Sequence, residues 1–351
     1  MSDLTKIDKN FATVSTVHKD GMVFYSADQY PMRLYGVFYD GEQYIRMPRD
    51  VAASVNPGVE SINTNTVGGR VRFTTDSSRI VISAKRNTGY CPVHMTYILV
   101  AGFDLYEDDT YVCTFLPNGE RSGEQKFEAS RSFDERRERN FTINFPAYGP
   151  VSELLIGIEE GATLKPAPDY TYEKPFLIYG SSITQGGCAT RPGAVHSAHL
   201  SRWLDSNYIN LGFSGSAKGE QNMAKYIASL DISALVMEYD HNAPNIQHLA
   251  ETHEPFFKTI REAKPDLPII LATRPAFMPS SDRDGRYAVI KKTYDNAVMA
   301  GDKNVYFASM PAALEEIGNE GTVDGCHPND LGFFCMAKGL YPALKDALTK
   351  K

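Results

Sequence analysis

The chain lacks the features that mark several large classes of protein. Its five cysteines are scattered without a C-x-x-C pair, which disfavours a disulfide framework or a zinc cluster and favours free thiols in a reducing compartment. Acidic residues outnumber basic ones by 43 to 36, so no basic footprint for nucleic acid is expected. No apolar run approaches membrane-spanning length. The opening residues, MSDLTKIDKNFATV, lack the regions of a secretion signal, and we expect a cytoplasmic protein that binds neither membrane nor nucleic acid.

The sequence does have enough chain for two hydrophobic cores. With 351 residues, 42% hydrophobic and 23% charged, it resembles an ordinary globular protein, and this length favours two domains. The texture changes at the proline-rich segment GATLKPAPDYTYEKP, which shows no periodicity. We therefore expect a first domain over 1–165, a linker over 166–175 and a second domain over 176–351.

The first half consists of short runs rich in Val, Ile, Thr, Tyr and Phe, separated by turn residues. Several alternate apolar and polar residues, as in Arg70-Val71-Arg72-Phe73, which is typical of a half-buried strand. The runs are MVFYSAD, GRVRFTT, RIVISAKR, HMTYILVAGFDLY (94–106), YVCTFL, NFTINF and ELLIGIEE. Many short strands with almost no helical periodicity predict an antiparallel, jelly-roll-like β-sandwich.

The second half alternates nearly continuous apolar runs with amphipathic stretches such as EQNMAKYIASL. Apolar runs of this kind are expected of parallel strands buried on both faces. They are FLIYG (176–180), YINLGF (208–213), ALVMEYD (234–240), LPIILATR (267–274) and NVYFASM (304–310). The alternation predicts a three-layer α/β/α domain around a five-stranded parallel sheet. In such folds ligands bind beyond the carboxyl ends of the strands.

Two adjacent serines follow the first of these strands, in IYGSSITQGG (178–187). The stretch is not the G-x-S-x-G elbow of α/β-hydrolases, because Thr184 occupies the place of the second glycine. One interpretation is a serine that caps a helix N-terminus. The other is a nucleophile. Both are compatible, since a helix N-terminus also offers N–H groups that can hold an oxyanion.

A second polar block, VDGCHPNDLGF (323–333), follows the last predicted strand. Asp324 and His327 are three residues apart, so the carboxylate can reach one ring nitrogen while the other faces outward. A serine needs such a base, and the base works best when a carboxylate fixes its tautomer. The alternative is an Asx turn with an exposed histidine. The block returns to the same sheet edge as the serines, which favours the catalytic interpretation.

Two further blocks follow the second and third strands. NLGFSGSAKGE supplies Gly215, where a bare backbone can approach a ligand closely. MEYDHNAPN supplies Asn242, whose amide can donate to a developing oxyanion. Taken singly, both residues are explained as well by turns.

Together, the order Ser, Gly, Asn and Asp-x-x-His on successive strand ends resembles the SGNH (GDSL-type) hydrolase family over the whole C-terminal half. The family motif G-[DS]-S-[IL]-[TS] implies that Ser182 is the nucleophile, with Ser181 where an aspartate is usual. It also implies that His327 is the base and Asp324 its partner. The implied oxyanion hole consists of the Ser182 and Gly215 N–H groups and the Asn242 side chain. The usual G-x-N-D is missing; Asp240-His241-Asn242 aligns with its G-x-N, and Asn245 is an alternative donor.

In the first half, Gly102-Phe103-Asp104-Leu105-Tyr106 looks like the GxDLY signature of sandwich domains that precede an SGNH domain. The arrangement resembles two-domain carbohydrate acetyl esterases, and it also occurs in a few acyltransferases of natural-product pathways. Asp104 is read equally well as a turn or strand-end residue, and we do not assign it to the site.

The resemblance implies a serine esterase that removes acetyl groups from sugars such as xylo- or manno-oligosaccharides, with no cofactor and no metal. An acyltransferase with the same residues is the alternative, and a non-catalytic carbohydrate-binding protein is a third. Arg274 and His241 are candidate substrate-binding residues at the sheet edge, although Arg274 is explained as well by a salt bridge to a loop carboxylate. The oligomeric state, the sugar and the acetylated position are not apparent from the sequence.

Overall fold

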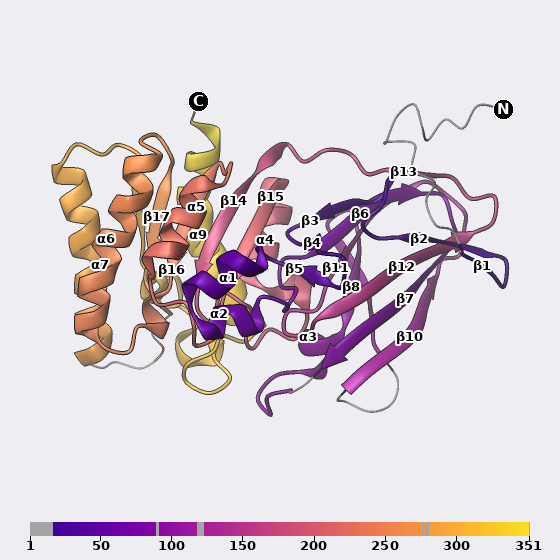
Figure 1. Cartoon of the computed structure of the whole chain (residues 1–351), viewed down its shortest axis with the longest axis horizontal. Coiled ribbons are helices and arrows are strands. Elements are labelled where there is room, and N and C mark those ends of the chain that lie inside the picture. The colour runs from indigo at the N-terminus through magenta and orange to yellow at the C-terminus, as the bar shows by residue number, and fades with distance from the viewer. Residues whose placement is uncertain (1–16, 89–90, 118–122, 276, 278–280, 351) are drawn as a thin grey trace.

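Antiparallel strands make up the first half of the computed structural model, which describes residues 17–88, 91–117, 123–275, 277 and 281–350 (Figure 1). One sheet has the order β1 (Val17–Lys19), β2 (Met22–Ser26), β12 (Val151–Glu159), β7 (Arg79–Thr88), β10 (Gly123–Ser132). The other has the order β13 (Leu164–Pro166), β6 (Arg70–Thr75), β11 (Arg139–Asn144), β8 (Phe103–Glu107), β9 (Thr110–Phe115), with β3 (Arg33–Tyr35) also paired to β6. Inward-facing aromatic and aliphatic residues of both sheets form one core. The predicted β-sandwich is confirmed.

The prediction of a single strand over 94–106 is wrong. The first part of this run forms helix α3 (Tyr97–Ala101), and only the second part belongs to β8. Thr96 caps the helix by accepting a hydrogen bond from the Leu99 N–H at 3.1 Å. Periodicity cannot distinguish a short buried helix from a strand in such a run, whereas the cap does. The sequence analysis also missed the elements α1 (Arg49–Val55), α2 (Pro57–Ile62), β4 (Phe38–Tyr39), β5 (Tyr44–Ile45) and β10.

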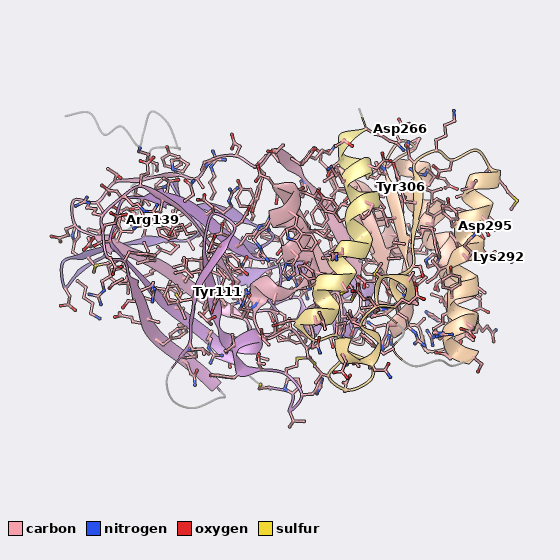
Figure 2. The ribbon with its side chains drawn as sticks, turned by 180° about the vertical axis from the view of Figure 1, so that it is seen from behind. Tyr111, Arg139, Asp266, Lys292, Asp295 and Tyr306 are labelled. Atoms are coloured by element: carbon pink, nitrogen blue, oxygen red, sulfur yellow. The ribbon has the colours of Figure 1, made fainter. Side chains whose placement is uncertain are left out.

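The second half contains the predicted five-stranded parallel sheet. Its order is β15 (Ser206–Gly212), β14 (Tyr172–Gly180), β16 (Ala234–Glu238), β17 (Ile269–Ala272), β18 (Val305–Ala308). The helices of this half are α4 (His196–Leu204), α5 (Gln221–Ser229), α6 (Ile246–Ala263), α7 (Ser281–Met299), α8 (Met310–Ala313) and α9 (Asp330–Thr349). Figure 2 shows α9 lying across one face of the sheet.

Alternate residues of β14 face opposite layers, as expected of a strand buried on both sides. Phe176 and Ile178 belong to the core shared with α4 and α9. Leu177 and Tyr179 belong to the core shared with α5, α6 and α7. The three-layer α/β/α architecture is therefore confirmed. Strand β14 begins at Tyr172, inside the segment expected to be a linker, and the exact domain boundaries stay a prediction.

The GxDLY residues join the sandwich to the turn that precedes α4. The buried Asp104 carboxylate accepts hydrogen bonds from the Gly193 N–H and the Asn144 amide, both at 2.7 Å. It also forms an ion pair with Arg191 at 3.3 Å. The Tyr106 hydroxyl donates to the Gly193 carbonyl at 3.2 Å. The motif thus fixes the β-sheet against the segment that follows the two serines.

The cysteines and the helices bear on two exclusions made from the sequence. All five cysteines are free thiols. Within the described ranges, no helix is both long and apolar enough to cross a membrane. The first 16 residues, which include the segment without a secretion signal, lie outside the described part of the chain.

Candidate active site

The end of β14 places the two serines at the edge of the sheet. Gly180 lies between Gly212 and Glu238 in the register of the neighbouring strands. A Cβ atom at Gly180 would come 2.0 Å from the Thr184 hydroxyl and 2.6 Å from the Glu238 carbonyl, so only glycine fits there. The chain then turns sharply. This close approach positions the serines directly above the strand end.

The two serine side chains have different partners. Ser181 is 1% exposed, and its hydroxyl accepts a hydrogen bond from the Ile183 N–H at 3.2 Å. The Ser182 hydroxyl lies 3.0 Å from Nε2 of His327. Ser181 therefore stabilises the turn, and Ser182 faces the histidine.

The loop before α9 brings His327 and Asp324 together as the sequence spacing suggested. Nδ1 of His327 lies 2.8 Å from Oδ2 of Asp324. Oδ1 of Asp324 accepts hydrogen bonds from the backbone N–H groups of His327 and Cys326 at 2.7 and 2.9 Å. These contacts fix the carboxylate against its own loop. Ser182, His327 and Asp324 form one hydrogen-bonded row.

The charge state of Asp324 defines the tautomer of the His327 imidazole. Partial burial acts to raise the pKa of Asp324, but hydrogen bonds from His327 and Cys326 outweigh it and lower the pKa to about 2. The carboxylate is therefore ionised at neutral pH and accepts the Nδ1 proton of His327. The lone pair of Nε2 is left to face the Ser182 hydroxyl, which is the arrangement that a general base needs.

Two backbone N–H groups in the loops that follow β14 and β15 are the predicted oxyanion donors. Gly215 has φ +66° and open space around its Cα, so its backbone can face a ligand. Within the described ranges, neither the Ser182 N–H nor the Gly215 N–H has a hydrogen-bond acceptor. Unpaired N–H groups at one sheet edge suit a developing oxyanion.

The structure separates the two candidate asparagine donors. Nδ2 of Asn242 donates to the Phe213 carbonyl at 2.9 Å, so it lies against the loop that carries Gly215. Phe213 itself donates its N–H to the Gly180 carbonyl at the end of β14. Asn245 is exposed and caps α6 by accepting from the His248 N–H at 2.8 Å. The contacts favour Asn242, and the assignment of the donor role stays a prediction.

Arg274 and His241 both have protein partners. Arg274 forms an ion pair with Asp282 at 2.8 Å, but this carboxylate belongs to the first turn of α7 and not to a loop as the alternative interpretation had it. Nε2 of His241 lies 2.9 Å from Sγ of Cys326, in the loop between Asp324 and His327. Burial, together with the nearby Arg274 and His327, lowers the pKa of His241 to about 4, so this ring is neutral. Substrate binding by either residue stays a prediction.

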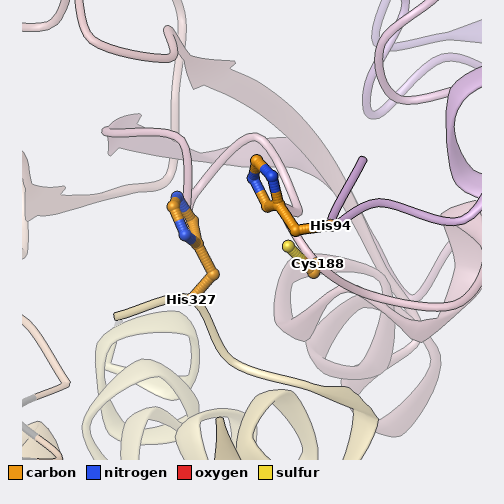
Figure 3. Close-up of side chains that lie close together, drawn as sticks. All are labelled: His94, Cys188 and His327. Atoms are coloured by element: carbon orange, nitrogen blue, oxygen red, sulfur yellow. The ribbon is translucent and has the colours of Figure 1, made fainter. Parts of the chain in front are cut away.

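The sequence analysis missed the side chains that the sandwich contributes. The Tyr148 hydroxyl donates to the Ser182 carbonyl at 3.0 Å. The His94 ring lies beside that of His327, with centroids 5.3 Å apart (Figure 3). A Cβ atom at Gly187 would lie 2.7 Å from Met95. These residues come from loops without a motif, so no sequence signal connects them to Ser182.

A buried pair of a carboxyl group and an imidazole beneath the turn was also missed. Oε2 of Glu238, at the end of β16, lies 3.1 Å from Nε2 of His196 and accepts a hydrogen bond from the Thr184 hydroxyl at 3.2 Å. Thr184 is two residues from Ser182. Through Thr184, the buried pair therefore supports the turn that carries the two serines.

This fold and this site define the class of SGNH-type hydrolases. Residues 173–345 match the profile of the GDSL-like Lipase/Acylhydrolase family. Residues 22–164 match GxDLY, the N-terminal domain of SGNH-hydro-type esterases. The second half of the chain is therefore a domain of the GDSL-like lipase/acylhydrolase family, and a GxDLY domain precedes it.

Solved structures share this two-domain arrangement. A protein of Bacteroides ovatus assigned to the GDSL-like lipases is 28% identical, with a TM-score of 0.82 over 94% of this chain and 99% of that one. The salicylyl-acyltransferase SsfX3 of a tetracycline biosynthetic pathway is 20% identical, with a TM-score of 0.77 over 94% and 98%. The acetyl xylan esterase Est2A of the rumen bacterium Butyrivibrio proteoclasticus is 16% identical, with a TM-score of 0.58 over 93% and 98%. At these identities, the similarity to the acyltransferase and to the acetyl xylan esterase shows a common fold and nothing more. No curated protein matches the sequence significantly.

Proposed function

We propose that the chain is a serine esterase that removes O-acetyl groups from carbohydrates such as acetylated xylo- or manno-oligosaccharides. The observation that carries the proposal is the row from Ser182 Oγ through His327 to Asp324, with contacts of 3.0 and 2.8 Å. An esterase of this kind needs no cofactor, and its cytoplasmic location remains a prediction from the sequence.

In the first half of the reaction, Ser182 Oγ attacks the ester carbonyl while His327 Nε2 takes the hydroxyl proton. The negative charge on the former carbonyl oxygen is held by the Ser182 and Gly215 N–H groups and the Asn242 amide. Asp324 stabilises the imidazolium. When the tetrahedral intermediate collapses, His327 gives the proton to the sugar oxygen, the C–O bond to the sugar breaks, and an acetyl-serine remains.

In the second half, water takes the place of the sugar hydroxyl. His327 removes one proton from the water, the oxygen attacks the acetyl carbon, and a second tetrahedral intermediate forms in the same donor set. Its collapse breaks the bond to Ser182 Oγ, returns the proton to that oxygen and releases acetate. Each residue thus acts twice, and the enzyme returns to its starting state.

The surroundings of Ser182 favour a short acyl group. The residue is 6% exposed, and Tyr148 contacts its carbonyl from the sandwich side. Tyr148 and Met95 also lie within 3 Å of a Cβ position at Gly187, so little room remains beside the nucleophile turn. Such crowding suits acetyl better than a long acyl chain. The likeness in fold to the acetyl xylan esterase supports a sugar as the alcohol part.

One screen tests this proposal. The full chain is incubated with acetylated xylo-, manno- and gluco-oligosaccharides, and loss of acetyl is read by mass, with Ser182→Ala as the matched control. A parallel series of 4-nitrophenyl esters compares acetate with butyrate and octanoate. We expect acetyl loss from at least one sugar and a rate that falls with acyl length. Equal rates for the acetate and octanoate esters would contradict the proposed preference for a short acyl group.

An acyltransferase with the same residues is the second candidate. The likeness in fold to the salicylyl-acyltransferase, with a TM-score of 0.77, favours it. In that reaction an alcohol acceptor replaces water in the second half. Product analysis with an added acceptor separates the two: a transferase forms the new ester in preference to acetate.

A further inference from the structure

We propose that His94, Cys188 and His327 form a binding site for a zinc-type divalent ion that blocks the esterase when it is occupied. The three residues come from the loop before α3, the turn after Ser182 and the loop before α9, and Figure 3 shows them side by side. One ligand atom of each lies within 4.8 Å of the other two. The site is formed only by the fold, so it has no C-x-x-C spacing in the sequence.

The ligand types select the ion. Two imidazoles and one thiol are nitrogen and sulfur ligands, which suit zinc and related ions better than magnesium or calcium. Three protein ligands with one open position form a usual zinc set. Zinc bonds of about 2.0–2.3 Å require the three atoms to draw slightly closer than 4.8 Å. His94 is exposed at the edge of its loop, so its ring has room to turn toward the ion.

The other two ligands are already held in place. Nδ1 of His327 lies 2.8 Å from the Asp324 carboxylate, which leaves Nε2 as the ring nitrogen for an ion. Metal-binding histidines commonly donate their second ring N–H to a carboxylate in this way. Cys188 is 4% exposed, and its backbone N–H donates to the Pro328 carbonyl at 3.0 Å, next to His327 in the chain. The fixed positions of His327 and Cys188 therefore support the metal site independently of the chemical types of its ligands.

Occupation of the site removes the base from the reaction. Nε2 of His327 has one lone pair, which can bind either the Ser182 proton or the ion. This lone pair points toward Ser182, whose Oγ is 3.0 Å from Nε2, so a bound ion takes the place of the proton. Binding of the ion displaces the thiol proton of Cys188 into solvent. The inhibition rests on the proposed esterase function, whereas the binding of the ion does not.

The experiment uses the purified full chain, freed of metal with a chelator, and titrates it with Co²⁺ and Zn²⁺. We expect one ion per chain, a thiolate-to-Co²⁺ charge-transfer absorption, and inhibition of ester hydrolysis by Zn²⁺ that the chelator reverses. His94→Ala should need about tenfold more Zn²⁺, or higher, for half-inhibition, measured against its own metal-free rate. Cys188→Ser should lose the charge-transfer absorption.

A matched control keeps the test specific. Cys335→Ser removes a thiol of α9 that is not part of the site, and it should bind Co²⁺ with the wild-type absorption. The proposal is overturned if Zn²⁺ inhibits the wild type and His94→Ala equally, or if the Co²⁺ absorption survives Cys188→Ser. A chain that binds Co²⁺ through Cys188 and His94 but hydrolyses no ester would retain the metal site and refute the esterase.

Discussion

Two pairs of a carboxyl group and a histidine lie in the hydrolase domain. One lies at the edge of the parallel sheet that carries Ser182, here called the rim, and the other is buried beneath that edge. At the rim, Asp324 and His327 are 2.8 Å apart, with side chains 34% and 17% exposed. Beneath it, Glu238 and His196 are 3.1 Å apart and 1% and 0% exposed. The two pairs have the same chemical groups at similar distances. Their surroundings differ.

The difference lies in what the second ring nitrogen meets. Nε2 of His327 faces the Ser182 hydroxyl, so a proton can pass to it. Nδ1 of His196 has no hydrogen-bond partner among the described residues, and the ring stacks on Phe333 with centroids 5.5 Å apart. A carboxylate–histidine pair is therefore not by itself a mark of catalysis. The same pair is proposed to act as a base at the rim and as a structural support in the core.

The nucleophile provides the largest test of this comparison. Ser182→Ala should lower kcat for an acetyl ester by roughly a million-fold, because it removes the proposed nucleophile. Ser181→Ala removes a turn contact and should keep most of the activity. Hydrolysis of 4-nitrophenyl acetate measures both, with circular dichroism to verify folding. A reversed result would move the nucleophile to Ser181.

The rim carboxylate should matter next. Asp324→Asn keeps the shape of the side chain but favours the wrong imidazole tautomer, which costs about 10⁴-fold in kcat in a comparable triad. Its melting temperature should change little, since the side chain is one-third exposed. Steady-state kinetics and thermal unfolding measure the two effects. A kcat within tenfold of wild type would contradict the role of Asp324.

An oxyanion donor at the rim should have a smaller effect. Asn242→Ala removes one donor and should lower kcat by about 10²- to 10³-fold with little change in KM. Asn245→Ala is the matched control, because Asn245 caps α6 and should cost only about 1 kcal/mol of stability. If Asn245→Ala lowered kcat and Asn242→Ala did not, the donor would have to be reassigned.

The buried pair should show the opposite balance of effects. Glu238→Gln keeps the shape of the side chain but weakens its contacts to His196 and Thr184, and an impaired buried hydrogen bond costs about 1–3 kcal/mol. We expect a lower free energy of unfolding in urea, and a kcat that falls far less than in Asp324→Asn. Stability equal to wild type would show that the buried pair is not a structural support.

The last effect concerns pH and a second buried carboxyl group, Asp240. Burial, opposed by the Arg274 N–H and nearby arginines, raises the pKa of Asp240 to about 7. Because the unfolded value is about 3.9, its contribution to stability is complete below that pH and is lost as the pH rises through about 7. Asp240→Asn should therefore have a melting temperature that decreases less than that of wild type between pH 4 and 8. Parallel curves over this range would contradict the raised pKa.

The sequence predicted the rim better than the layer beneath it, for a physical reason. Ser182, Gly215 and Asn242 follow predicted strands, and parallel strands bring their carboxyl ends to one edge. Asp324 and His327 are three residues apart, so their contact is local. Glu238 and His196, by contrast, meet across 42 positions with no common spacing. Such contacts arise from packing, which periodicity does not encode.

The sandwich shows the same limit. Its strands were predicted from their alternation, yet TYILVA formed a helix because the Thr96 cap decided between two conformations that the apolar pattern allows. The approach of His94 and Tyr148 to the serine turn depends on how the two domains meet. The contacts of the GxDLY motif fix how the two domains meet. The motif was recognised in the sequence, whereas its partners Gly193 and Arg191 were not.

Ser182 is the proposed activated hydroxyl of the chain, and covalent labelling tests this assignment most directly. The full chain is treated with a serine-directed phosphonate, digested, and sequenced by tandem mass spectrometry. We predict one adduct, on Ser182, which forms far more slowly in His327→Ala. An adduct on Ser181 instead, or no adduct in a chain that is folded, would contradict the account.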